Sequence, residues 1–259
     1  MKRTRSLLAT LCLAFSAQAC AHGGIADVTV FDRTEGRQLP VHWHEGRAWV
    51  VGKPGNEYSV RIRNRQGEDV LGVVSVDGVN VVTGETATPQ QSGYVISPWH
   101  LVEVSGWRKN LASTAAFYFT ALPDSYAART GRPDNVGVIG VALFKRKRIE
   151  PPPADIAPLS RQAPAAGAGS MARESARAEA PARAYAEDRL GTGHGRIEAS
   201  HARTVGFERA TPYPQETIAI YYDSYRNLVA RGVIREPVPP VYPRPQPRPF
   251  PGFVPDPPA

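Results

Sequence analysis

The sequence predicts a mainly all-β protein, an antiparallel β-sandwich followed by a short strand-and-helix segment. Residues 58–64 (YSVRIRN) alternate apolar and polar side chains, which is typical of a strand buried on one face. Asp77-Gly78 is a residue pair that tight hairpin turns favour, and it lies between two valine-rich runs. No stretch between the predicted strands of the first 150 residues is long enough for a helical crossover, so neighbouring strands should pair antiparallel.

About nine short strands are expected in this first part, with a turn signal roughly every ten residues, which indicates a sandwich or a barrel. One helical turn is expected at 124–129, with Asp124 or Ser125 as its N-cap. The predicted strands are 25–31, 48–51, 58–64, 70–76, 79–82, 93–96, 101–104, 115–119 and 136–144.

The composition changes after the predicted sandwich domain, residues 22–150. Residues 151–188 are rich in Ala, Pro, Gly, Arg and Glu and have almost no large apolar side chains, so we expect a disordered linker. Residues 189–235 regain strand character at 196–207 and 216–222 and should end in a helix over 224–231. This segment is short for a separate domain, so we expect it to dock on the sandwich and add strands to an edge. Residues 236–259 form a proline-rich tail, expected to be extended or disordered.

The first 21 residues have the layout of a secretory signal peptide, with a basic start, a short apolar run and small residues before the cleavage site. Cleavage after Ala21 would leave His22 as the N-terminus. Cleavage before Cys20 would instead leave a cysteine for lipidation, and both alternatives stay open. We therefore expect either a periplasmic or secreted protein, or an outer-membrane lipoprotein. Cys12 and Cys20 are the two cysteines of the sequence, so the mature sandwich must rely on its hydrophobic core.

The charge pattern gives little support for nucleic-acid binding. The net charge of +7 includes the three cations of the predicted signal peptide. The densest basic cluster, residues 145–148 (KRKR), lacks interleaved aromatic residues and is typical of a solvated strand end. An anionic surface is the alternative partner for this cluster. Because export also argues against nucleic acid, we expect a protein or an envelope polymer as the partner.

Two histidines suggest a metal site as one hypothesis. His42 and His44 flank Trp43, so on a strand both imidazoles would point to the same side. With His22 as the mature N-terminus, a third imidazole and an amino group become available to copper or zinc. An N-terminal histidine on a secreted β-sandwich resembles the copper sites of periplasmic copper carriers and polysaccharide monooxygenases. Exposed histidines near a turn are the alternative interpretation, because H-x-H alone is a weak motif.

A second group of candidate residues surrounds the predicted hairpin. Asp77, Asn80 and Glu85 offer two carboxylates and an amide that can serve as acid and base or bind a cation. Their spacing fits no calcium loop, and the Asp77-Gly78 pair is also what a tight turn requires, so a structural role is the alternative.

The third candidate is the loop-like sequence GWRK. Trp107, Arg108 and Lys109 can present an aromatic ring and two cations to a ligand, within an exposed patch that includes Trp99 and Tyr118. Alternatively, Trp107 packs into the core and Arg108 pairs with a nearby carboxylate. The glycine-rich run 191–195 precedes a strand-like segment and lacks the helix N-terminus of a phosphate loop, and no nucleophile motif is present.

Several sequence words resemble an uncharacterised family of secreted proteobacterial proteins. They are SVDGVNV, GWRK, DSYAARTG, NVGVIGVA and YDSY, spread over residues 25–145 and 189–235. The resemblance implies export and a shared fold, and it implies no activity or catalytic residue. From the sequence we therefore predict an exported, envelope-associated binding or interaction protein without a cofactor. A periplasmic copper or zinc protein is the alternative, and an enzyme is the third hypothesis.

Overall fold

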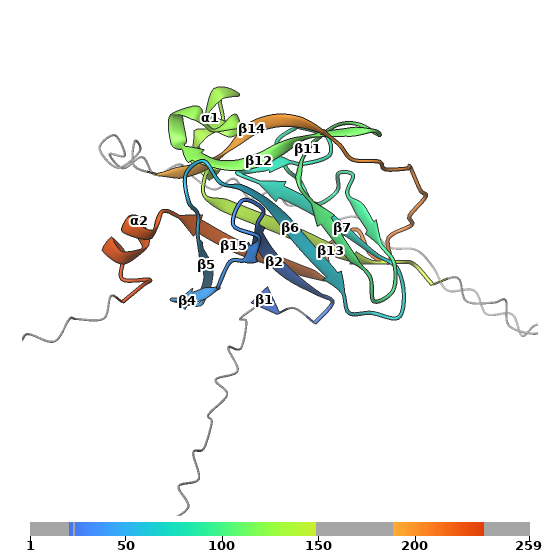
Figure 1. Ribbon diagram of the computed structural model, residues 1–259. Helices are drawn as coiled ribbons and strands as arrows, with labels where there is room; N and C mark the ends of the chain where they lie inside the picture. Colours follow the sequence, from blue (N-terminus) through green and yellow to red (C-terminus); the bar gives the residue numbers. More distant parts are fainter. Residues whose placement is uncertain (1–20, 23, 149–188, 236–259) are drawn as a thin grey trace, which may run out of the picture.

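Two β-sheets pack face to face and enclose the main hydrophobic core (Figure 1). The structure is a computed structural model that describes residues 21–22, 24–148 and 189–235. The expected signal peptide up to Cys20, the linker 151–188 and the tail 236–259 lie outside these residues. The predicted all-β sandwich is confirmed.

Sheet A, the first sheet, follows the order β1-β2-β6-β12-β11, with β3 beside β2, β10 beside β6, and β14 beside β12. Its strands are β1 (Ala21–His22), β2 (Ala26–Asp32), β3 (Arg37–Gln38), β6 (Glu57–Asn64), β10 (Leu101–Val104), β11 (Gly106–Asn110), β12 (Ser113–Ala121) and β14 (Leu190–Ala199).

Sheet B, the second sheet, follows the order β4-β5-β15-β13-β7-β8, with β9 beside β7. Its strands are β4 (His42–His44), β5 (Arg47–Val51), β7 (Val70–Val76), β8 (Val79–Asn80), β9 (Tyr94–Ile96), β13 (Val138–Lys145) and β15 (Glu216–Asp223).

The core forms because inward-facing side chains of both sheets meet between the layers. β2 shows the strict alternation of a strand that is buried on one face, and Val28 and Val30 are fully buried. β7 and β13 are buried along most of their length, because a second apolar cluster covers the outer face of sheet B. This second cluster consists of Leu71, Val73, Ala142 and Phe144, with Val95 and Phe207 packed against it.

The C-terminal strands are part of both sheets, which corrects the expectation that they would only add to an edge. β14 extends sheet A beside β12, as expected for an edge strand. β15 instead lies in the interior of sheet B, between β5 and β13. Its Ile220 and Tyr222 are buried in the main core, so the sandwich is incomplete without residues 216–223.

One strand pair also differs from the antiparallel expectation. β15 runs parallel to β5, with Ile220 opposite Ala48 and Asp223 opposite Val51. The sequence argument considered only crossovers within the first 150 residues. β15 enters the sheet from a segment far along the chain, so that argument did not apply to it.

β14 begins earlier than expected, at Leu190 and not near residue 196. Glycines at alternate positions lower strand propensity, and this hid the strand from sequence analysis. The packing explains them, because a Cβ on Gly193 would lie 2.2 Å from Cζ of Tyr118 on the neighbouring strand β12. Residues 200–207, predicted as strand, are instead irregular.

Two short helices lie at the end of the sandwich next to β14 and beside β15 (Figure 1). They are α1 (Tyr126–Arg129) and α2 (Tyr225–Ala230). Ser125 and Ser224 are their N-caps, and each hydroxyl accepts a backbone N–H of the first turn. Ser125 is one of the two N-caps expected for the first helical turn. Within the described residues, no helix has the length and apolar character needed to cross a membrane.

Candidate functional site

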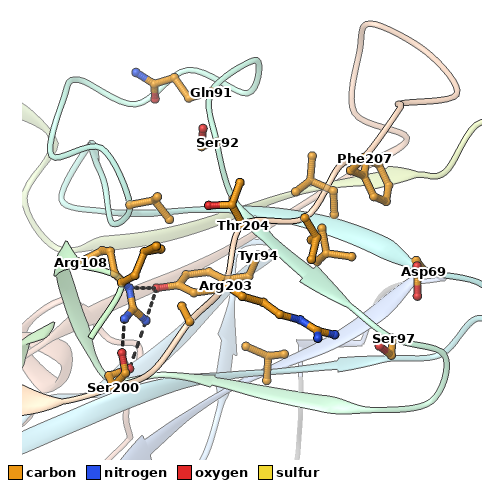
Figure 2. Close-up of a pocket in the computed structure, with 18 of the residues that line it drawn as sticks. Asp69, Gln91, Ser92, Tyr94, Ser97, Arg108, Ser200, Arg203, Thr204 and Phe207 are labelled. Atoms are coloured by element: carbon orange, nitrogen blue, oxygen red, sulfur yellow. Dashed lines mark hydrogen bonds between the residues drawn. The ribbon is translucent and has the colours of Figure 1, made fainter. Parts of the chain in front are cut away.

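A groove of about 820 Å³ lies beside the free edge of β9 (Figure 2). Its walls come from β9, from the corner between β10 and β11, and from the irregular segment 200–209 that follows β14. These parts are far apart in the sequence, so only the folded chain brings them together.

The groove exists because sheet A divides at this corner. β6 and β12 pair directly only near Tyr58 and Phe117, whereas β10 pairs with β6 and β11 pairs with β12. The change of partner occurs at Ser105, whose carbonyl accepts the Phe117 N–H at 2.9 Å. Glycine is required next, because a Cβ on Gly106 would lie 2.1 Å from the Ala115 carbonyl oxygen.

Arg108 is the cation of the GWRK sequence that enters the groove. Its guanidinium donates to the carbonyl oxygen of Ser200 at 2.5 Å, to the Ser200 hydroxyl at 3.1 Å and to the Tyr94 hydroxyl at 3.2 Å (Figure 2). These partners are neutral, and no carboxylate of the described residues lies within ion-pair distance. A fixed, half-buried guanidinium without a counter-charge is suited to bind an anionic ligand group.

Two further arginines carry charge into the groove without an acidic partner among the described residues. Arg209 donates to the carbonyl oxygens of Gln90 and Gln91 at 3.1 and 2.7 Å, and burial lowers its pKa. Arg203 is exposed and also lines the groove (Figure 2). Together with Arg108, they make this part of the groove cationic.

The two carboxylates that line the groove are occupied by other cations. Asp69 binds Arg146, a fourth lining arginine, at 3.0 Å. Glu103 accepts the Ser59 hydroxyl at 2.6 Å and pairs with Arg61 at 3.2 Å. Neither carboxylate therefore neutralises the three unpaired arginines.

The rest of the lining combines an apolar floor with small polar groups. Leu71, Val95 and Phe207 belong to the cluster on the outer face of sheet B and also line the groove. Hydroxyl and amide side chains complete the walls; they are Gln90, Gln91, Ser92, Ser97, Ser200 and Thr204. Such a lining offers hydrogen bonds to a polar, anionic ligand and an apolar surface beneath it.

Asn80 and Glu85, two of the predicted site residues, support one wall without lining the groove. The buried Asn80 amide donates to the Gln91 side chain and to the Ser92 carbonyl oxygen, both at 3.1 Å. Its oxygen accepts backbone N–H groups of the following turn, the closest that of Val82 at 2.7 Å. Glu85 is exposed and accepts the Gln91 amide at 3.2 Å. These contacts hold residues 90–92 in place.

Asp77, the third member of that predicted group, lies in the core and not in the groove. It is fully buried at the Asp77-Gly78 hairpin turn, where both φ angles are positive. Its carboxylate accepts the Gly137 N–H at 2.9 Å, the Thr192 N–H at 2.8 Å and the Tyr222 hydroxyl at 2.5 Å. Burial nevertheless raises the pKa of Asp77 to about 6.

A buried chain of hydroxyl groups continues from Asp77 across the two sheets. The Tyr222 hydroxyl lies 2.7 Å from that of Thr192, which lies 2.6 Å from that of Tyr58. Each of these side chains is at most 1% exposed. Because no member reaches solvent, this network joins the sheets and cannot contact a ligand.

The predicted aromatic patch is only partly formed. Trp107 is 3% exposed and packs against Phe117 and Tyr126, so its expected role as an exposed aromatic ring is wrong. Alternation along β11 explains this, since Trp107 points to the core and Arg108 to the groove. Tyr118 is half-buried, whereas Trp99 is 64% exposed.

Lys109 is exposed and does not line the groove. Burial, and to a smaller extent the charge of Lys109, lower the pKa of His194 on β14. The charge of Lys109 therefore affects His194 on β14, and it does not add to the charge of the groove.

The histidine hypothesis receives no further support from the described residues. His42 and His44 are half-buried on the edge strand β4, with Trp43 exposed between them. Among residues with described side chains, no group of three His, Cys, Asp or Glu is placed to hold a metal ion. The His22 side chain and Cys20 lie outside them, so the metal site and the lipidation stay predictions.

Sequence reasoning missed the segment 200–209 and Tyr94 as parts of a site. The signal in the segment was two arginines, Arg203 within the predicted strand 196–207 and Arg209 just after it. Tyr94 was assigned to a predicted strand and given no further role.

Comparison with known proteins finds no family model, no curated protein and no solved structure that matches this chain. The function is therefore argued from the groove itself.

Proposed function

We propose that this chain is an exported binding protein whose groove holds a segment of an acidic envelope polysaccharide. The observation that carries the proposal is the set of three arginines, Arg108, Arg203 and Arg209, which face one groove without acidic partners among the described residues. Charge–charge contacts with carboxylates or phosphates would supply this missing counter-charge.

The remaining lining favours a sugar chain over a purely apolar ligand. Serine, threonine and glutamine side chains along the walls can exchange hydrogen bonds with sugar hydroxyl groups. Tyr94 contributes a ring whose hydroxyl is already bound by Arg108, so the aromatic face is held in a fixed orientation. The groove is also large enough for several sugar units, given that typical small-molecule sites measure roughly 300–1,000 Å³.

The fixed position of Arg108 reduces the entropic cost of binding. Its contacts to Ser200 and Tyr94 already order the side chain before a ligand arrives, whereas Arg203 is exposed and would have to become ordered. We therefore expect Arg108 to contribute more affinity than Arg203, although its removal would also disturb the groove wall.

The test is calorimetric titration of the mature chain with an oligogalacturonate, using a neutral maltooligosaccharide of equal length as the control ligand. Arg203→Ala should weaken binding of the acidic oligosaccharide about fivefold, corresponding to about 1 kcal/mol. Lys109→Ala is the matched control, because Lys109 is an exposed cation that does not line the groove, and it should leave the affinity unchanged.

The affinity should also fall as salt is added, because exposed charge pairs are screened. Equal binding of the neutral and acidic oligosaccharides would overturn the proposal. So would an absence of binding at low salt, or an equal loss of affinity in the Lys109→Ala variant.

A further inference from the structure

Trp99 occupies a turn position that is normally filled by glycine. Residues 97–100 form a tight turn in which the His100 N–H donates to the Ser97 carbonyl oxygen at 3.1 Å. Pro98 is the second residue, and Trp99, the third, has a φ of 62°. A type II turn needs a positive φ at this third position, so the sequence places its largest side chain where L-residues are strained.

Burial of the side chain does not offset the free-energy cost of this strained conformation, because the Trp99 side chain remains 64% exposed. Its indole lies over Gly67 of the neighbouring turn, where a Cβ would be 4.0 Å from Trp99 Cζ2. A bulky residue in this conformation persists only where the surroundings fix it, and such positions are concentrated at functional sites.

Asn64 fixes the turn. Its backbone N–H donates to the His100 carbonyl oxygen at 2.9 Å, and its buried amide donates to the carbonyl oxygens of Ser97, Ile96 and Glu68 at 2.8–3.0 Å. One side chain thus holds both adjacent turns, and the indole is kept at the surface of the sandwich.

The surroundings of Trp99 are apolar and cationic. Leu101 is 43% exposed and lies opposite Arg63 in the register of β10 and β6. Arg63 is exposed and has no acidic partner among the described residues. Asp27 lies opposite Arg63 in the register of β2 and β6 and pairs with Arg65, while Glu68 pairs with Arg148. The three arginines thus outnumber the two carboxylates at this end of the molecule.

The beginning of the described chain lies at the same end of the molecule. The Arg65 N–H donates to the Ile25 carbonyl oxygen at 3.0 Å, and Arg65 belongs to the turn that also contains Gly67 beneath Trp99. Cys20, the candidate lipidation site, precedes Ile25 by five positions in the sequence. A lipid on Cys20 would therefore hold this end near a bilayer.

We propose that the tip formed by Trp99, Leu101 and Arg63 docks on a membrane surface that contains anionic lipid head groups. Tryptophan is suited to this interface because its ring is apolar while its N–H still binds water or head groups. Arginine beside it is attracted to anionic lipid. Such a tip binds weakly by itself and acts as the second signal beside an acyl chain, because stable anchoring takes two signals.

The test is sedimentation of the mature chain beginning at His22 with vesicles of phosphatidylcholine and phosphatidylglycerol in equal parts. The protein should bind these vesicles, and the binding should weaken in vesicles of phosphatidylcholine alone. Trp99→Ala should lower the vesicle-bound fraction at least threefold. Trp43→Ala is the matched control, because Trp43 is 58% exposed on the distant edge strand β4 and should not matter.

Trp99→Gly separates docking from folding. This variant relieves the strained turn, so it should keep or increase the unfolding temperature while it loses vesicle binding. The proposal is overturned if the mature chain does not bind the anionic vesicles, or if Trp99→Ala binds them as well as the natural chain. It is also overturned if Trp99→Ala weakens oligogalacturonate binding and leaves vesicle binding intact, which would assign Trp99 to the groove.

Discussion

Asp77→Asn should remove a pH dependence that the buried carboxylate imposes on folding. Burial raises the pKa of Asp77 from 3.8 to about 6 in the folded protein. Between these values the folded chain holds a proton that the unfolded chain releases. Asp77 therefore contributes stability that is fully present below about pH 4 and is lost as the pH rises through about 6.

The expected size follows from this difference. A shift of about two pKa units corresponds to about 3 kcal/mol of unfolding free energy. Asparagine does not titrate in this range and tolerates the positive φ of 52° at this position. It also places an N–H₂ group where the carboxylate accepts hydrogen bonds, which adds a constant cost of about 1–3 kcal/mol.

The assay is urea unfolding followed by tryptophan fluorescence, for the natural chain and the Asp77→Asn variant, from pH 4 to pH 7. Subtracting the two unfolding free energies at each pH cancels other carboxylates, such as Glu57 and Glu198, whose pKa values are lowered by arginine contacts and which oppose the trend. The advantage of the natural chain should shrink by about 2.5 kcal/mol from pH 4 to pH 7, slightly less than the full difference because the unfolded carboxyl is already partly ionised at pH 4.

A second variant tests the cause of the pKa shift. Tyr222→Phe removes a hydroxyl that donates to Asp77 and lowers its pKa, so the pH-dependent range should extend above pH 6. A constant difference between the natural chain and Asp77→Asn would refute the reasoning. It would mean that the three donors, and not burial, decide the ionisation of Asp77.

Three further substitutions test the fold by chemical unfolding. Trp99→Gly should stabilise the protein by about 1 kcal/mol, because glycine adopts a positive φ without strain; a loss of stability would contradict the turn argument. Gly106→Ala should cost about 3 kcal/mol through its clash with the Ala115 carbonyl, while Gly206→Ala, where nothing lies within 4 Å, should change little. Ile220→Ala should cost about 3 kcal/mol because β15 is an interior strand, whereas Ala at the exposed Ile197 of β14 should be nearly neutral, and equal effects would argue against this topology.

Local patterns predicted most elements of the first part of the chain. The alternation of residues 58–64 predicted β6, and Asp77-Gly78 predicted the turn between β7 and β8, because both signals depend on neighbours a few residues apart. The same is true of the N-cap of α1, which was expected at Asp124 or Ser125 and is Ser125. The glycines of β14 gave the opposite signal, because the partner that requires them, Tyr118, is distant in the sequence.

The candidate site was predicted much less well than the fold. Arg108 was selected for its charge, and it lies in the groove. Its neighbours Trp107 and Lys109 were selected with it, but strand alternation turns them away. Asp77 was selected as a polar group at a turn, and only the packing of Tyr222 and Thr192 around it shows that it belongs to the core.

The sequence by itself determined the sheet-forming segments, the hairpin and caps, and the expectation of a sandwich, because alternation and turn chemistry are local properties. Only the tertiary structure decided that β15 completes the interior of sheet B, and that residues 200–209 close a groove against β9 and Arg108. It also decided that Trp99 is held at the surface by Asn64, 35 positions earlier in the sequence. These outcomes depend on contacts between distant segments, whose free energy is gained only when the whole chain packs, and no local pattern encodes them.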